Sequence, residues 1–259
     1  MSDREAFYLP LGDGRYEPTR AAESPWDPEA QHGGPPAALL AHLIDETVDD
    51  GLRLARLSID FLGAIPRREL AVAVEPVKPG RRVWLSQAQM LVADRAVVVA
   101  RTWHIATGPR PPVDDPATRA PAVPAAQEQR YFHGIADWGY GKAIEWRFTE
   151  GAFDTPGPTG VWTRVRLPLI AGEPITPLAR TLIVADSANG LSTTLPIAEW
   201  WSIPPGMTTT LMREPAGEWV HLASQTRLAD DGIGIAHADL HDERGFLGEV
   251  AQPLLISPR

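Results

Sequence analysis

The feature that most constrains the fold is an apolar helix near the N-terminus. Residues 37–44 contain almost no polar side chain before Asp45 and Glu46. A helix that is apolar nearly all round is a buried one, so we expect a sheet wrapped around it. The segment His32-Gly33-Gly34-Pro35-Pro36 precedes this run, and prolines fit a first helical turn. The unpaired N–H groups and positive dipole end at such a helix start can hold a phosphate or a developing oxyanion.

Composition excludes several classes of function. The formal charge of -9 argues against nucleic acid as a partner, because phosphate binding requires a basic face. The chain has no cysteine, which rules out disulfides, thiol catalysis and thiolate metal sites. No apolar run approaches the length of a membrane span. We therefore expect a soluble cytoplasmic protein with no membrane span.

Strands are expected after the first helix, because Leu57, Ile59 and Phe61 alternate with polar residues. In the first half they are predicted at 54–62, 70–76, 82–91 and 96–106. In the second half they are predicted at 143–148, 161–169, 208–212, 218–228, 232–240 and 246–256. A second apolar helix is predicted over 178–188, with Thr176 as its N-cap and Pro177 in its first turn.

A proline-rich stretch separates the two halves. Residues 108–127 contain six prolines, which is typical of a stiff, extended linker. The predicted domains are therefore 1–107 and 128–259, joined by the linker at 108–127.

The second half repeats the plan of the first. With an offset of 149 residues, Pro66 falls on Pro215 and the turn 93–96 falls on 242–245, without a gap over this region. Each half then has the same order of elements: a strand region, a central helix and a run of antiparallel strands.

This arrangement, with His-Gly-Gly at the start of an apolar helix, resembles the hot dog fold. Two copies in one chain resemble the double hot dog acyl-CoA thioesterases of the acyl-CoA thioesterase II class. In the second half the resemblance rests on 185–190, 213–215, 218–219, 242–245 and Gln252. It implies an α+β tandem hot dog, with two long antiparallel sheets that each wrap around a central apolar helix.

The resemblance also implies an active site shared between the two hot dog units. One helix offers a backbone N–H to the thioester carbonyl, and the facing unit offers a carboxylate that activates water or attacks directly. In single hot dog relatives an acid stands nine residues after the histidine, within an Ala-Asp-Ser-Ala-like segment. Here that position is Ala41, whereas Ala185-Asp186-Ser187-Ala188 lies in the second helix. Gly33 and Gly34 are therefore expected to face Asp186 across one pocket.

The acyl-CoA thioesterase II pattern adds a strand aspartate, a serine or threonine on the next strand, and a glutamine near the end. Gln252 matches the glutamine, and Thr226 lies within one residue of the hydroxyl position. The aspartate position falls near 207 or 208, where none stands, so Asp186 is favoured as the catalytic acid. Gln252 and Thr226 either orient water or are inward polar residues bonded to backbone. Asn189 either assists Asp186 or caps the helix.

The remaining candidates concern binding. His32 is expected to form structural hydrogen bonds beside the substrate rather than act as a base. Arg81 and Arg82 are candidates for the CoA phosphates, with a solvated turn as the alternative.

No metal site and no cofactor are expected, because CoA is part of the substrate. His237, Asp239 and His241 have a spacing that could ligate a metal, but the preferred interpretation is a solvent-facing strand.

The function predicted from the sequence is hydrolysis of acyl-CoA to free acid and CoA, a step of lipid metabolism. A non-catalytic acyl-CoA or fatty-acyl binding protein on the same fold is the alternative. A hot dog hydratase is disfavoured, because the Asp-x-Asn-Pro-x-His-type segment of those enzymes is missing. A homodimer or higher oligomer is expected.

Overall fold

The computed structural model describes residues 6–113, 118–135 and 137–259. Its first half contains a short 3-10 helix, η1 (Arg20–Ala22), and one long helix, α1 (Gly34–Asp45). Its strands are β1 (Tyr8–Gly12), β2 (Arg15–Pro18), β3 (Leu52–Phe61), β4 (Leu70–Lys78), β5 (Val83–Val92) and β6 (Arg95–Ala106).

The second half contains three helices, α2 (Gly139–Ala143), α3 (Pro177–Ala185) and α4 (Ala188–Leu191). Its strands are β7 (Ile144–Ala152), β8 (Thr155–Val165), β9 (Trp200–Ile203), β10 (Gly206–Leu211), β11 (Val220–Leu228), β12 (Ile233–Asp242) and β13 (Gly245–Pro258). The sequence did not predict α2 or β9, both of which are short.

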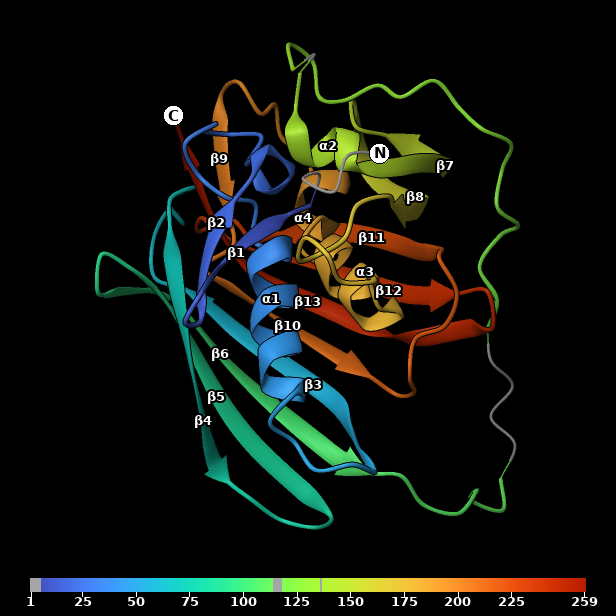
Figure 1. Cartoon of the computed structure of the whole chain (residues 1–259). Helices are drawn as coiled ribbons and strands as arrows, with labels where there is room; N and C mark the ends of the chain where they lie inside the picture. Colours follow the sequence, from blue (N-terminus) through green and yellow to red (C-terminus); the bar gives the residue numbers. More distant parts are fainter. Residues whose placement is uncertain (1–5, 114–117, 136) are drawn as a thin grey trace.

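The strands of both halves form one curved sheet around the helices (Figure 1). The order is β1-β2-β4-β5-β6-β3-β10-β13-β12-β11-β8-β7, with β9 paired to β13. The tandem hot dog prediction is confirmed, but the two expected sheets are continuous. They join where β3 pairs antiparallel with β10, with Ser58 opposite Thr208. This join is the centre of an approximate two-fold arrangement of the two halves.

The repeat is real, but its offset is 150 rather than 149. Strands β4, β5 and β6 begin at 70, 83 and 95, and β11, β12 and β13 begin at 220, 233 and 245. An error of one residue matters in a strand, because it moves every side chain to the opposite face. The gap-free match from sequence was therefore close, but it assigned the wrong faces.

Helices α1 and α3 pack against each other in opposite directions beneath the sheet. Gly34, at the start of α1, lies so close to the Ile183 carbonyl that an added Cβ would overlap it. At the other end, Asp45 of α1 and Pro177 of α3 line a common pocket. The start of one helix is thereby placed beside the end of the other.

The second apolar helix is interrupted where the sequence predicted continuity. Asp186 ends α3 as its C-cap, and Ser187 is the N-cap of α4. The Thr176 side chain caps the start of α3, as predicted, by accepting from the Ala179 N–H. The interruption places Asp186 at the junction of the two short helices.

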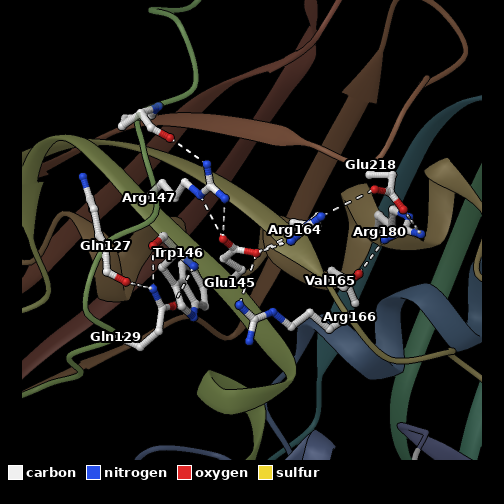
Figure 2. Close-up of polar contacts among 11 residues, drawn as sticks. Gln127, Gln129, Glu145, Trp146, Arg147, Arg164, Val165, Arg166, Arg180 and Glu218 are labelled. Carbon is white, nitrogen blue, oxygen red and sulfur yellow. Dashed lines mark hydrogen bonds and ion pairs between the residues drawn. The ribbon is translucent and has the colours of Figure 1, made fainter. Parts of the chain in front are cut away.

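The proline-rich linker is held to the edge of the sheet by side-chain amides. Its residues 114–117 lie outside the described part. Gln127 donates to the Phe148 carbonyl and accepts from the Phe148 N–H. Gln129 does the same with Trp146 of β7 (Figure 2). These two amides satisfy backbone groups of an edge strand that an additional strand would otherwise bind. The domain boundaries at 107 and 128 stay predictions.

Beside this edge, the buried Glu145 carboxylate receives three arginines. Arg147 lies at 2.7 Å, Arg164 at 2.6 Å and Arg166 at 3.2 Å (Figure 2). Burial alone would raise the pKa of Glu145, but the hydrogen bonds from the three guanidinium groups outweigh it and lower the pKa to about 2. This cluster ties β7 to β8 through charge-assisted hydrogen bonds.

Candidate active site

A pocket of about 670 Å³ lies between the two halves of the chain. His32 and Gly33 enter it from the segment before α1, and Asp186 enters it from the junction of α3 and α4. The sequence prediction that the start of the first helix and the Asp186 carboxylate share one pocket is therefore met in the geometry. Asp186 is only 9% exposed, and its exposed part faces this pocket.

Gln252 fixes one oxygen of the carboxylate. Its side-chain Nε2 donates to Asp186 Oδ1 at 2.8 Å and to the Asp186 backbone carbonyl at 3.2 Å. Its Oε1 accepts the Asn189 backbone N–H at 3.0 Å. Gln252 is fully buried on β13, so it has no freedom to move away. The Oδ2 atom of Asp186 remains for chemistry.

His32 meets that second oxygen. Its Nδ1 lies 3.2 Å from Asp186 Oδ2 and accepts the Gly34 backbone N–H, also at 3.2 Å. A nitrogen that accepts from Gly34 has no proton of its own to donate to Asp186. Burial lowers the pKa of His32, and the Asp186 charge only partly opposes this. The imidazole nitrogen and the carboxylate oxygen are thus in direct contact, and His32 offers that oxygen no proton.

The start of α1 offers one free amide to the pocket. Pro35 and Pro36 have no N–H, and the Gly34 N–H is used by His32. Within the described part of the chain, no acceptor binds the Gly33 N–H. The structure thus places the Gly34 N–H on His32, which leaves Gly33 as the candidate donor, and the prediction of an oxyanion site at this helix start stays a prediction.

Gly33 is also a point of close approach between the two halves of the site. A Cβ built on Gly33 would lie 2.8 Å from Asp186 Oδ2 and 2.5 Å from Phe61 Cζ. A side chain here would displace one of these groups. The glycine therefore brings the candidate donor amide and the carboxylate into reach of one reacting atom.

Tyr140 stacks against His32, and no pattern in the sequence signalled this role. Its ring stacks on the imidazole with centroids 4.0 Å apart and planes 11° apart. Its hydroxyl donates to the Ile183 carbonyl at 2.8 Å and pairs with Ser187 Oγ at 2.9 Å. Tyr140 thus links the histidine to the helix end that carries Asp186. Only a prediction of α2 would have pointed to it.

Asn189 and Thr226, two of the predicted site residues, bind segments beside the site and not the Asp186 carboxylate. The Asn189 side chain exchanges hydrogen bonds with Ser202 of β9, at 2.9 and 2.8 Å, and does not bind Asp186. Thr226 lies in the same cross-strand row as Gln252, but β12 separates them. The Thr226 hydroxyl pairs with Ser192 at 2.8 Å, at the end of α4. The structure therefore places neither side chain in hydrogen-bond contact with the Asp186 carboxylate, and their catalytic roles stay predictions.

Arg81 and Arg82 lie at the wrong end of the molecule for this site. They follow β4, and the Arg82 carbonyl accepts the Ala106 N–H at the end of β6. Ala106 pairs with Leu52, which lies just beyond the C-terminus of α1. A helix of this length spans about 18 Å, and the pocket lies at its other end. Their predicted contact with CoA phosphates is therefore not supported within one chain, because a solvated turn occupies the position.

His237, Asp239 and His241, whose spacing was considered for a metal, do not form a metal site. A β-bulge between Leu240 and His241 interrupts the alternation. Asp239 is exposed and His237 is half-buried, whereas His241 is buried against Phe246. Among the described residues, no group of three histidine or acidic side chains is arranged to hold a metal ion.

A second pocket, of about 400 Å³, lies at the opposite end of the helix pair. It is the approximate two-fold mate of the first, because α3 provides its helix start and α1 its helix end. Ala41 is fully buried and gives this pocket no acid. Asp45 lines it instead, with Oδ1 3.1 Å from Nε2 of the buried His104. The pairing of Gly33, His32 and Asp186 is thus absent from this second pocket.

Comparison with known proteins assigns both halves of the chain. The sequence model of the acyl-CoA thioesterase N-terminal domain matches residues 22–105. The model of the acyl-CoA thioesterase C-terminal domain matches residues 113–256. The chain belongs to the acyl-CoA thioesterase family. This acyl-CoA thioesterase is therefore a thioester hydrolase.

Solved structures agree with this acyl-CoA thioesterase over nearly its whole length. A putative thioesterase II from Thermobifida fusca has 19% identity and a TM-score of 0.72, covering 96% of this chain and 95% of its own. An acyl-CoA thioesterase II from Mycobacterium marinum has 16% identity and a TM-score of 0.69, covering 97% and 95%. A hot dog protein of unknown function from Alicyclobacillus acidocaldarius has 14% identity and a TM-score of 0.74, covering 99% and 97%. These likenesses support the fold.

The comparison of this chain with curated proteins found no match. Within the described residues, no helix combines the length and the apolar character needed to cross a bilayer.

Proposed function

We propose that this thioesterase hydrolyses acyl-CoA to a free acid and CoA, with Asp186 as general base and the Gly33 N–H as oxyanion donor. The observation that carries the proposal is the approach of Asp186 Oδ2 to Gly33 within one pocket. Acyl transfer to water needs a base for the water and a donor for the developing oxyanion. These two groups supply both functions from opposite halves of the chain.

The proposed steps balance as follows. Asp186 Oδ2 takes a proton from water as the oxygen bonds to the thioester carbon. The carbonyl electrons move to oxygen, where the Gly33 N–H stabilises the charge. The intermediate collapses by breaking the carbon–sulfur bond, and the proton held at Asp186 passes to the departing CoA thiolate.

His32 and Gln252 are proposed to position the base. Gln252 holds Oδ1, so only Oδ2 is free to meet the water. The unprotonated His32 Nδ1 lies 3.2 Å from Oδ2 and offers it no proton, so Oδ2 stays available to the water. Direct attack of Asp186 on the thioester, through an anhydride, is the alternative chemistry for the same residue. Labelled water separates the two routes, because in a single turnover the anhydride route places oxygen from water in Asp186.

The test of the function is a series of acyl-CoA thioesters, from short to long, with release of free CoA measured. Hydrolysis by the unmodified protein and its loss in Asp186→Asn support the proposal. Asp239→Asn is the matched control, because Asp239 is exposed on the outer side of β12. Binding of CoA esters without hydrolysis of any of them would select the binding-protein alternative.

We also infer that the enzyme needs no cofactor, acts in the cytoplasm and assembles as a homodimer or higher oligomer. The proposed steps use only Asp186, Gly33 and their neighbours. Full activity after dialysis against a chelator is the expected result, and loss of activity restored by a metal ion would contradict it. Light scattering tests the oligomer, with a monomer at working concentration as the contrary outcome.

A further inference from the structure

The walls of the large pocket are unusually rich in aromatic rings. Six line it: Trp26, Phe61, Phe132, Trp138, Phe153 and Trp201. Four of them form one connected cluster. Phe132 lies 4.8 Å from Phe153, 5.7 Å from Trp26 and 5.8 Å from Trp138, measured between ring centroids. Trp201 is engaged elsewhere, because the Arg259 guanidinium covers one of its faces at 3.7 Å.

The rings of this aromatic cluster are held in place by the fold. Phe132, Trp138 and Phe153 are each at least 95% buried, and the Trp138 Nε1 donates to the Glu23 carbonyl at 2.8 Å. Trp26 is the exception: 42% of it is exposed, so it stands at the mouth of the pocket. The cluster is therefore a preformed surface rather than a set of side chains that adapt to any chain.

The charges in the pocket are acidic. Its ionisable side chains among the described residues are Asp27, Asp186 and His32, and none of the described residues that line it is a lysine or arginine. Arg259, which covers Trp201, lines the smaller adjoining pocket instead. The lining of the large pocket therefore suits the acyl part of the substrate better than the phosphates of CoA. An acyl group with a second carboxylate would be buried beside acids without a partner, which is costly.

We propose that the preferred acyl group is bulky, uncharged and ring-bearing; this deepens the proposed function and rests on it for the reaction. An aromatic ring gains edge-to-face contacts with the cluster beyond the burial of its area. A ring also loses less conformational freedom on binding than a flexible alkyl chain of similar length. Aryl-alkanoyl thioesters are therefore better substrates than linear acyl thioesters of matched length, and dicarboxylic acyl thioesters are excluded.

The test uses CoA thioethers, which bind but cannot be hydrolysed, so that binding is separated from catalysis. S-(4-phenylbutyl)-CoA, S-octyl-CoA and S-(4-carboxybutyl)-CoA are titrated calorimetrically into the full-length protein. The phenylbutyl compound is expected to bind about fivefold more tightly than the octyl compound. The carboxybutyl compound is expected to bind at least about tenfold more weakly than either.

Two variants locate the preference. Trp26→Leu and Phe132→Leu are expected to bring the phenylbutyl-to-octyl ratio close to one, because leucine keeps apolar area but offers no ring. Trp103→Leu, on β6 outside the pocket, is the matched control and should keep the ratio. Trp26 is half-exposed, so its variant folds even if Phe132→Leu does not.

The outcomes distinguish this inference from the function itself. Equal binding of the two thioethers, or tighter octyl binding, overturns the ring preference even while octanoyl-CoA is hydrolysed. Ring-selective binding with no thioester hydrolysed supports the acyl class and overturns the hydrolytic function. No binding of any thioether overturns both.

Discussion

The Nδ1 of His32 lies 3.2 Å from Oδ2 of Asp186 while it accepts the Gly34 N–H. These residues lie far apart in the sequence, in opposite halves of the chain. Their contact makes one site from the start of one helix and the end of another. Because Nδ1 has no proton to give, Asp186 faces a second acceptor rather than a donor. Oδ2 of Asp186 thus receives no proton from His32.

Replacing His32 by a residue that does not titrate should make the stability of the fold depend less on pH. The folded-state pKa of His32 is lowered by burial, so the unfolded chain binds the proton first as pH falls. Its contribution to stability is complete above about pH 6.5 and is lost as pH falls below that value. His32→Asn keeps an acceptor for Gly34 but does not titrate.

The measurement is the midpoint of thermal unfolding at each pH from 8 to 5. The variant is expected to lose less stability than the unmodified protein over the lower part of this range. His221, whose pKa burial lowers to about 4, contributes a parallel loss to both proteins and cancels in the difference. Identical pH profiles for the two proteins would show that His32 does not titrate differently on unfolding.

A methyl group at Gly33 should damage catalysis more than stability. It would meet Phe61 and Asp186 Oδ2, so the carboxylate and the donor amide move apart. A displacement near 1 Å in a reacting group lowers rates by about 100-fold, and we expect a fall of that order in kcat/KM for Gly33→Ala. Gly108→Ala, where nothing lies near the added Cβ, is the control. Equal activity in both variants would remove Gly33 from the site.

Gln252 and Thr226 should behave differently, although they share one row of the sheet. Gln252→Ala frees Asp186 Oδ1 and leaves the buried Asn189 N–H unpaired, so kcat should fall at least about tenfold and stability by about 1–3 kcal/mol. Thr226→Val removes only the contact with Ser192. It should keep kcat within about threefold, since a hydrogen bond of this kind contributes about 1 kcal/mol to stability. A larger loss of kcat in Thr226→Val would restore its predicted catalytic role.

Glu145 should account for part of the acid sensitivity of the fold. Its pKa is lowered to about 2, so its contribution is complete above about pH 4.5 and is lost as pH falls toward 2. A shift of this size corresponds to about 3 kcal/mol. Glu145→Gln should unfold at a lower temperature at pH 7, and the difference should shrink below pH 4. A constant difference across that range would assign the loss to packing instead.

Much of the fold was predictable because it is encoded locally. The apolar run of α1, the cap at Thr176 and the alternation in β3 each determine an element without distant contacts. The offset of the repeat failed by one residue, because sparse identities do not determine strand register. The break at Asp186 was missed because an apolar run contains no signal for a helix junction. The junction is stabilised by a distant residue, the buried Gln252 on β13.

The site was predictable only in outline. Gly33 was expected from its place at a helix start and Asp186 from the resemblance to hot dog thioesterases, and the structure brings them together. The contact of the Gly34 N–H with a side chain two residues earlier was not foreseen, because such a turn has no clear sequence signal. Tyr140 was missed because it reaches His32 from another part of the chain by tertiary packing alone. Arg81 and Arg82 were placed by charge type, which carries no information about which end of a helix they lie beside.

The central claim is that Asp186 and the start of α1 form one hydrolytic site, and the Asp186→Asn variant tests it most directly. The measurement is kcat for release of CoA from each accepted acyl-CoA, together with the unfolding midpoint of both proteins. The account predicts a fall in kcat of about 100-fold to 10,000-fold, with the unfolding midpoint little changed. Near-normal kcat for the variant on every accepted thioester would contradict it.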